Sequence, residues 1–346
     1  MKSKDNLIEL CKELGVPTFR AKQVLQAIYK EGKNSYADIA VLPKEVREIF
    51  TERAPIFCFT VEREVKSPLG NTVKTLFKLP DGALIEGVLM RFSDGRNSVC
   101  ISSQVGCGLK CSFCSTGTMG FKRNLTAEEI SDQVLYFDQL LKKENTRVDH
   151  IVFMGMGEPM LNYDNVMTAI RTFNDPDCLH IAARHITVST SGVVPGIKKF
   201  MKEPLQINLA VSLHAPNQAL RESFMPIAKA YKLDELMATL QLYMETTKRR
   251  VSYEYVMLKN INDSPEIAQQ LAQLIKGQLC HVNLIPYNET YLGFSNAGKS
   301  RIDTFRQIVE SYDVPVTVRV SLGQDISAAC GQLAAKETKE TGAQQK

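Results

Sequence analysis

The sequence Cys107-Gly-Leu-Lys-Cys111-Ser-Phe-Cys114 brings three thiol groups into one short stretch, with the spacing C-x3-C-x2-C. Thiolates hold iron–sulfur clusters, and this short spacing allows one loop to reach several corners of a four-iron cube. Three thiolates leave one iron without a protein ligand, and S-adenosylmethionine can bind to that iron and be cleaved to a radical. The same cysteines could instead be three ligands of a zinc ion. The spacing therefore predicts a metal centre and favours the radical cluster over zinc.

Length and composition limit the class of protein. The 346 residues are sufficient for one large hydrophobic core and a small accessory domain. Nine cysteines, an odd number, fit metal binding or catalysis better than a disulfide framework. The N-terminus has no apolar signal region, and no stretch approaches the roughly 18 apolar residues of a membrane span. We therefore expect a cytoplasmic protein, whose net charge of +4 permits nucleic-acid binding without requiring it.

The pattern of apolar residues changes along the chain. We predict a helical N-terminal part, a β-rich connector, a large core and a polar, disordered tail, at 1–54, 55–98, 99–333 and 334–346. In the first part, Phe19–Tyr29 has one apolar helical face, and a second helix begins after Pro43. In the connector, strand-like runs lie between turns rich in proline and glycine, at 59–65, 72–79 and 83–92.

The core alternates short β-branched runs with amphipathic helices. The candidate strands are 99–103, 151–154, 185–189, 207–212, 251–257, 282–285 and 316–320. Thr126 begins a capping box, Ser264-Pro265 opens a later helix, and Gly277 closes it. This alternation predicts an α/β fold with parallel βαβ units, in an open sheet or a barrel. In a barrel, the catalytic groups gather at the carboxyl ends of the strands.

One such strand end reads Met154-Gly-Met-Gly-Glu-Pro159. Glycines there allow close approach of the backbone to a ligand, and the carboxylate can hold an ammonium group. Taken alone, this motif is as typical of an ordinary glycine turn as of a binding site.

Together with the cysteine motif, several further stretches identify a family. They are Pro17–Val24, Cys100–Cys107, Met154–Pro159, Thr187–Gly192, Val211–Pro216, Met225–Ile227 and Asp325–Leu333, which ends in Ala-Ala-Cys-Gly-Gln-Leu. On these residues the chain resembles, over nearly its whole length, the radical S-adenosylmethionine family of RNA adenine methyltransferases. This is the RlmN/Cfr group, and Glu158-Pro159 favours its RlmN branch.

The resemblance implies a partial (β/α)6 barrel preceded by a small helical domain that faces RNA. It implies that a [4Fe-4S] cluster is held by Cys107, Cys111 and Cys114. The positions that match those holding S-adenosylmethionine are Gly157, Glu158, Ser189, Ser212, Leu213, His214 and Asn288. The catalytic positions it implies are Cys330 as the methylated cysteine, Cys100 as its redox partner and Glu86 as the proton acceptor.

The implied reaction methylates C2 of an adenosine in 23S rRNA, in tRNA or in both. C2 of adenine is not nucleophilic, so a radical route is needed. Cys330 would take a methyl from one S-adenosylmethionine, lose a hydrogen to a radical made from a second, and add to the base. Glu86 would then accept the C2 proton, and Cys100 would attack the Cys330 sulfur to form a disulfide. An external electron donor such as flavodoxin or ferredoxin and a monomeric enzyme are also expected.

Each assignment has a plainer alternative. Cys100 could be a small buried hydrophobe, Glu86 a solvent-facing strand residue and His214 a structural histidine. Cys11, Cys58, Cys178 and Cys280 have no motif around them and are interpreted as packing residues.

Alternatives remain for the reaction as well. Ser327 stands where an acid is common in the RlmN branch, a departure that concerns the choice of substrate more than the chemistry. The alternatives are C8 methylation as in Cfr, another radical reaction on RNA such as methylthiolation, and a non-enzymatic metal-binding RNA-binding protein. Methylthiolation would require further cluster-binding cysteines, and the remaining ones lack the spacing.

Overall fold

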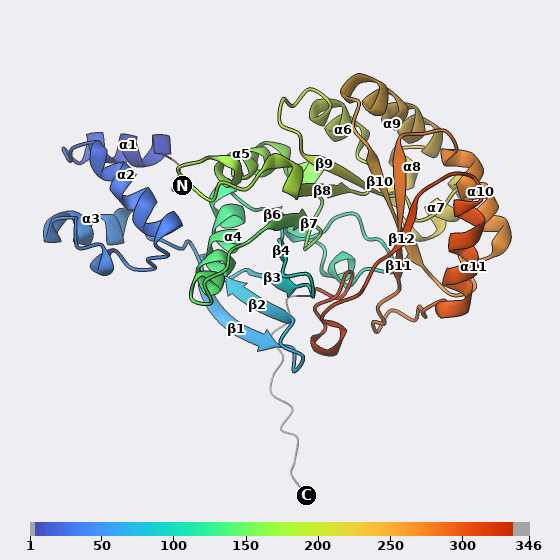
Figure 1. The fold of residues 1–346 in the computed structure, drawn as a ribbon, viewed down its shortest axis with the longest axis horizontal. Helices are drawn as coiled ribbons and strands as arrows, with labels where there is room; N and C mark the ends of the chain where they lie inside the picture. The colour runs from blue at the N-terminus through green and yellow to red at the C-terminus, as the bar shows by residue number, and fades with distance from the viewer. Residues whose placement is uncertain (1–3, 335–346) are drawn as a thin grey trace, which may run out of the picture.

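A sheet of ten strands runs through most of the chain in the computed structural model, which describes residues 4–334 (Figure 1). The strand order is β1-β2-β3-β4-β7-β8-β9-β10-β11-β12, so neighbours in sequence are mostly neighbours in the sheet. The predicted disordered tail lies outside the described residues, apart from Ala334. No helix among the described residues has the length and apolar character needed to cross a membrane.

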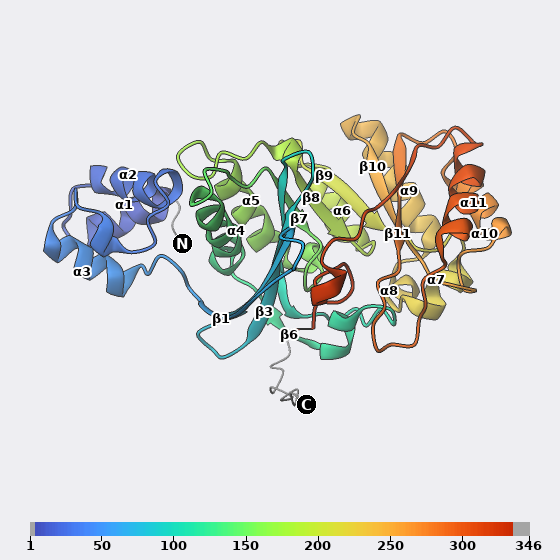
Figure 2. The ribbon, with the colours of Figure 1, turned by 60° about the horizontal axis from the view of Figure 1, so that its bottom comes forward.

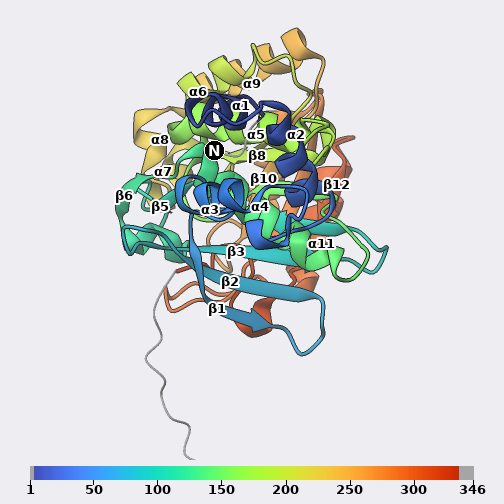
Figure 3. The same cartoon turned by 90° about the vertical axis from the view of Figure 1, so that its left-hand side faces the viewer.

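The N-terminal helices form a group at one end of the molecule (Figures 1 and 3). They are α1 (Lys4–Glu13), α2 (Phe19–Leu25) and α3 (Lys44–Arg53). The predicted helix over Phe19–Tyr29 is present, but its second half is a π-helical turn at Gln26–Lys30. Its predicted apolar face is buried, at Ala21, Val24, Leu25, Ile28 and Tyr29.

The connector forms three antiparallel strands, β1 (Thr60–Lys66), β2 (Thr72–Lys78) and β3 (Leu84–Arg91). β3 also pairs antiparallel with β4 (Asn97–Cys100), so the connector and the core share one continuous sheet. One face of this part packs on α4 (Ala127–Lys142) through aromatic rings, with the Phe77 and Phe137 centroids 6.0 Å apart. Our division of the chain into four parts stays a prediction.

The core strands from β4 onward are all parallel. They are β4, β7 (His150–Phe153), β8 (Ile186–Thr190), β9 (Asn208–Ser212), β10 (Val251–Met257), β11 (Cys280–Pro286) and β12 (Val316–Val318). Among the described residues β12 does not pair with β1, so the sheet curls without closing. This open arrangement is the predicted partial (β/α)6 barrel.

Helices connect each core strand to the next and cover the outside of the sheet (Figures 1 and 2). They are α4 (Ala127–Lys142), α5 (Tyr163–Asn174), α6 (Val194–Phe200), α7 (Gln218–Phe224), α8 (Ile227–Ala230), α9 (Leu233–Thr247), α10 (Pro265–Ile275) and α11 (Lys299–Glu310). The predicted capping box is present, because Thr126 and Glu129 exchange both side-chain-to-backbone hydrogen bonds. Gly277 follows α10 with a φ of +77°, as expected for a glycine after a helix.

A second, two-stranded sheet was not predicted. It consists of β5 (Gln104–Gly106) and β6 (Phe121–Asn124), which pair antiparallel on either side of the cysteine motif. Both strands are very short, and β6 contains Lys122 and Arg123, so neither has an apolar run that would reveal it.

Candidate active site

The cysteine loop is held in place by the ribbon of β5 and β6. The Cys107 amide donates to the Gly120 carbonyl at 2.9 Å, and the Ser112 amide donates to the Phe224 carbonyl at 3.0 Å. Gly106 has a φ of +73°, and a Cβ atom on it would lie 1.8 Å from the Gly120 oxygen. Only glycine allows the chain to enter the loop here.

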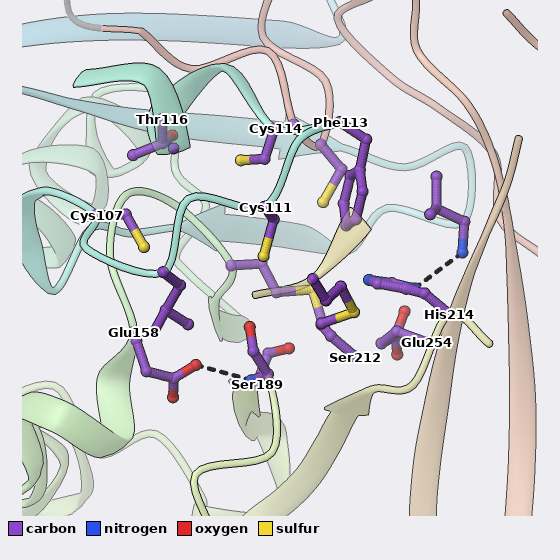
Figure 4. A pocket seen from close by; sticks show the side chains of 18 of the residues that line it. Cys107, Cys111, Phe113, Cys114, Thr116, Glu158, Ser189, Ser212, His214 and Glu254 are labelled. Atoms are coloured by element: carbon purple, nitrogen blue, oxygen red, sulfur yellow. Dashed lines mark hydrogen bonds between the residues drawn. The ribbon is translucent and has the colours of Figure 1, made fainter. Parts of the chain in front are cut away.

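Cys107, Cys111 and Cys114 line one cavity inside the open barrel, here called the cluster cavity (Figure 4). Across residues 4–334, no three His, Cys, Asp or Glu side chains converge on a point that would suit a single metal ion. Zinc needs such convergence, because Zn–S bonds near 2.3 Å place tetrahedral sulfurs about 3.8 Å apart. A four-iron cube binds each thiolate at a different iron. Three thiolates on one loop can therefore serve three different irons of such a cube.

The three thiols are buried, and burial raises the pKa of Cys107 to about 12. Burial likewise raises the pKa of Cys111 and Cys114. Because the metal ligand is the thiolate, cluster binding at this loop must be accompanied by release of protons.

The other walls of the cluster cavity come from the carboxyl ends of the core strands (Figure 4). Of the residues predicted to hold S-adenosylmethionine, those on this wall are Gly157, Glu158, Ser189, Ser212, His214 and Asn288. They come from the ends of β7, β8, β9 and β11, and these ends meet at one edge of the sheet because the strands are parallel. Leu213 is the exception: it is fully buried and is not among the residues that line the cavity.

The sequence suggested that Gly157 allows close approach of the backbone to a ligand, but the structure shows a different reason for glycine at this position. Its φ is +99°, and a Cβ atom on it would lie 2.5 Å from the Cβ atom of Gln104. A Cβ atom on Gly155 would lie 2.6 Å from the Ile101 carbonyl oxygen. The close approach at both glycines is therefore to the segment after β4, which brings the cysteine loop against the end of β7.

The Glu158 carboxylate accepts hydrogen bonds from the chain itself. Its Oε2 accepts from the Ser191 amide at 2.7 Å, and its Oε1 accepts from the Met160 amide at 3.0 Å. Burial raises the pKa of this carboxyl, while the two amides oppose the rise. Glu158 thus joins the ends of β7 and β8 and fixes the turn that carries Ser189 and Ser191.

His214 is a neutral hydrogen-bond donor. Burial, assisted by the charge of Arg221, lowers its pKa to about 3. Its Nδ1 accepts from the Val256 amide at 3.0 Å, so the ring proton resides on Nε2. The ring stands edge-on to Phe113 of the cysteine loop, with centroids 5.1 Å apart. His214 therefore has a structural role, as one alternative expected, because it binds the backbone of Val256 and packs on Phe113. It also lines the cavity.

Glu254 in β10 is a residue that our sequence reasoning missed. It is buried, lines the cluster cavity, and accepts a hydrogen bond from Asn283 at 2.8 Å. Burial raises the pKa of its carboxyl, and the charge of Arg319 opposes the rise. An acid in the middle of the apolar run 251–257 was the signal that could have revealed it.

Cys330 lines the cluster cavity and is held there through its backbone. The Asn288 side chain donates to the Cys330 carbonyl at 3.0 Å and accepts from Gln324 at 2.7 Å. The Ser115 amide, in the cysteine loop, donates to the Gly331 carbonyl at 2.8 Å. Asn288, predicted to hold S-adenosylmethionine, therefore uses both ends of its amide to fix the Cys330 segment.

Glu86 is buried, so the alternative in which it faces solvent is wrong. It lines a second cavity of about 690 Å³, here called the Glu86 cavity, a size typical of ligand pockets. Cys330 and Gly331 line the cluster cavity, whereas Ser327 and Ala334 line the Glu86 cavity. The Cys330 segment is thus the wall between the two cavities.

Cys100 ends β4 and lies just behind these walls. Burial and the neighbouring Cys330 raise its pKa to about 12, whereas the charge of Arg319 lowers it. All nine cysteines are free thiols, so the disulfide expected from the resemblance is not supported by this structure. The four cysteines without a motif are buried or half-buried, as packing residues would be.

Comparisons with known proteins agree with this site. Residues 101–271 match the family described as the radical SAM superfamily, and residues 2–56 match a domain described as the ribosomal RNA large subunit methyltransferase N-terminal domain. A protein of Symbiobacterium thermophilum, named as a probable dual-specificity RNA methyltransferase RlmN, is 44% identical over 96% of this chain and 89% of its own. A protein of the same name from Lysinibacillus sphaericus is 46% identical over 95% of this chain and 86% of its own.

A solved structure is similar over the same length. The crystal structure of a radical SAM methyltransferase from Sphaerobacter thermophilus has 45% sequence identity to this chain, with a TM-score of 0.94. The match covers 96% of this chain and 98% of the other. Relatives and a solved structure that are 44–46% identical over 95–96% of this chain show that the chain belongs to the RlmN family of radical S-adenosylmethionine proteins.

Proposed function

We propose that this protein methylates C2 of an adenosine in 23S rRNA and in tRNA, with Cys330 as the carrier of the methyl carbon. The observation that carries the proposal is that Cys330 lines the same cavity as the three cysteines of the metal-binding loop. Relatives at 43–46% identity over nearly the whole chain are named as dual-specificity RNA methyltransferases, which supports RNA as the substrate.

The cofactors are a [4Fe-4S] cluster and S-adenosylmethionine, which together supply the methyl group and a 5′-deoxyadenosyl radical. Cys107, Cys111 and Cys114 would hold the cluster, since all three lie on one loop and line one cavity. Gly157, Glu158, Ser189, Ser212, Leu213, His214 and Asn288 would form the S-adenosylmethionine site. Within this set, His214 offers an N–H donor, and Leu213 would act only through its backbone, because its side chain is buried elsewhere.

Cys330 would perform the covalent steps. Its thiolate takes a methyl group and becomes a thioether; loss of a hydrogen atom from that methyl gives a carbon radical. This radical adds to C2 of adenine, which joins the enzyme to the RNA through the new carbon–carbon bond. The Cys330 segment is held through its backbone carbonyls, which leaves the Cys330 side chain available for these steps.

Release would use Glu86 and Cys100. Glu86 accepts the C2 proton, and the Cys100 thiolate attacks the Cys330 sulfur, which breaks the bond between that sulfur and the transferred carbon. The carbon then takes a proton and becomes the methyl group of the product, and the one electron left over from the radical adduct would pass back to the oxidised cluster. Burial raises the pKa of Cys100 to about 12, so this residue is stored as the unreactive thiol, and the nearby charge of Arg319 favours its thiolate.

The wider setting follows from this chemistry. An external electron donor such as flavodoxin or ferredoxin would reduce the cluster, and a reductant must return Cys100 and Cys330 to thiols after each turnover. We propose a monomer that works in the cytoplasm, where its RNA substrates are, with residues 1–54 facing the RNA.

The test is nucleoside mass spectrometry of rRNA and tRNA incubated with the reconstituted protein, S-adenosylmethionine and a reductant. We expect 2-methyladenosine in both RNAs. The 8-methyl isomer would assign the protein to the Cfr reaction, and the absence of any methyladenosine from a preparation that cleaves S-adenosylmethionine would refute the substrate.

Two variants test the roles of the cysteines. Cys330→Ala should abolish methylation while keeping the cluster, and Cys100→Ala should accumulate protein crosslinked to RNA. Cys280→Ala is the matched control, because Cys280 is also buried but begins β11, at the opposite end of the strands from the site. Clean turnover by Cys100→Ala would exclude its role in release.

A further inference from the structure

The Glu86 cavity is bounded on one side by a single face of the connector sheet. In the pairing of β2 with β3, Leu76 lies opposite Glu86 and Lys74 lies opposite Val88. Because side chains alternate along a strand, Lys74, Leu76 and Glu86 point to the same face. All three line the Glu86 cavity, while the other face packs on α4. The sheet therefore presents one cation and one carboxylate side by side to the cavity.

Lys74 contacts both the proposed base and the segment that carries Cys330. Its Nζ lies 3.3 Å from Glu86 Oε1 and donates to the Ser327 carbonyl at 3.1 Å. The side chains of Lys74 and Glu86 are only 16% and 7% exposed, so water screens this pair weakly. The other carboxylate oxygen of Glu86 accepts from the Ala334 amide at 2.8 Å.

These contacts fix the geometry at both ends of the wall between the two cavities. Lys74 ties β2 to Ser327, three residues before Cys330, and Glu86 ties β3 to Ala334, four residues after it. The contact at Ser327 uses the backbone carbonyl, so the replacement of the usual acid by serine does not remove it.

We propose that Lys74 is a positioning residue for the release step, holding the Glu86 carboxylate in register with the Cys330 segment. This inference rests on the proposed function, because it assigns Lys74 to one step of that reaction. Lys74 does not reach the cluster cavity, since the residues that line it belong to the cysteine loop, the strand ends and the Cys330 segment. Methylation of Cys330 and formation of the link to RNA should therefore not depend on Lys74.

The experiment compares Lys74→Met with the parent in a single turnover on tRNA, under anaerobic conditions. We expect normal iron content, normal cleavage of S-adenosylmethionine and normal formation of the protein–RNA crosslink. Resolution of that crosslink should be about ten- to a hundredfold slower. This is smaller than most of the roughly 10²–10⁴-fold that a general base contributes, because Lys74 only positions the base. Lys74→Arg, which keeps the charge, should restore most of the rate. Lys78→Met is the matched control, because Lys78 is on the same strand but pairs with the exposed Glu62 at 3.8 Å.

Three outcomes would contradict the inference. Parental release by Lys74→Met would remove Lys74 from the step. An equal loss of crosslink formation and of release would show that Lys74 serves only the fold, as would a failure of Lys74→Arg to restore release. The Cys100→Ala variant separates these results from a failure of the proposed function. If it forms no crosslink, the covalent scheme is wrong and the role of Lys74 with it; if it does, the outcomes above concern Lys74 alone.

Discussion

Two glycines on either side of the cysteine loop make a matched pair for testing how the loop is held. Gly106 and Gly120 both have a positive φ, of +73° and +69°. A Cβ atom on Gly106 would lie 1.8 Å from the Gly120 carbonyl oxygen, whereas a Cβ atom on Gly120 would meet no atom within 4 Å. Alanine therefore brings backbone strain to both positions and a collision to only one.

The sizes of the two effects follow from these distances. At Gly106 the positive φ costs alanine about 1–2 kcal/mol. Gly120, with a φ of +69° and a ψ of 176°, lies in a region that essentially only glycine adopts; this costs alanine about 1–3 kcal/mol, which is the whole expected loss of stability in Gly120→Ala. In Gly106→Ala the Gly120 carbonyl must move from 1.8 Å to at least 3.0 Å from the new Cβ atom. This movement breaks its 2.9 Å hydrogen bond with Cys107, at about 1 kcal/mol, and overpacking adds about 1–3 kcal/mol. We expect a total loss of about 3–6 kcal/mol.

Urea unfolding measures the two free energies, and the iron and sulfide content after anaerobic reconstitution reports on the loop itself. Gly120→Ala should bind nearly as much iron as the parent. Gly106→Ala should lose most of its iron, because the displaced carbonyl is the partner of the first cluster cysteine. Equal losses of stability, or full iron content in both variants, would refute the reasoning that this contact sets the position of Cys107.

Three further predictions concern stability and protonation. Thr126→Ala removes the side-chain acceptor of the α4 capping box and should lower the free energy of unfolding in urea by about 1 kcal/mol. His214, with a pKa near 3, should stay neutral through the physiological range, so its ring NMR signals should not shift between about pH 5 and pH 8. Burial raises the pKa of Glu254 above its ordinary 4.5, so its contribution to stability is complete below that value and is lost as pH rises through the raised pKa. Glu254→Gln keeps an acceptor for Asn283 and should make the fall in unfolding free energy over this range less steep.

The family and the fold class were predictable because their signals are local. Each core strand is a short apolar run, and the capping residues Thr126 and Ser264 mark where helices begin. The three-cysteine spacing identified the cluster chemistry, and the comparisons confirm the family that it indicated. All ten strands of the main sheet were predicted to within a few residues for the same reason.

The details that escaped prediction depend on contacts between distant segments. No local pattern shows that Gly157 is required by Gln104, fifty-three residues earlier in the sequence, instead of by a ligand. Alternation along β3 could not decide which face Glu86 takes, because that depends on the Cys330 segment beyond β12. Glu254 was missed because a buried strand hides a single acid among apolar residues. In each case the missing information was the identity of the neighbour.

The arrangement of the two cavities explains why the connector and the core cannot act separately. The barrel offers only its strand ends to the site, and those ends already line the cluster cavity. The proposed methyl carrier, Cys330, comes from outside the barrel, on a segment that follows β12 and needs support on its far side. The connector supplies that support through Lys74 and Glu86, and β3 pairs with β4 directly beside Cys100. Removing residues 55–98 would leave the remaining core strands with an unpaired edge. It would also remove the contacts of Lys74 and Glu86 with the Cys330 segment, so the connector belongs to the active site as fully as the barrel does.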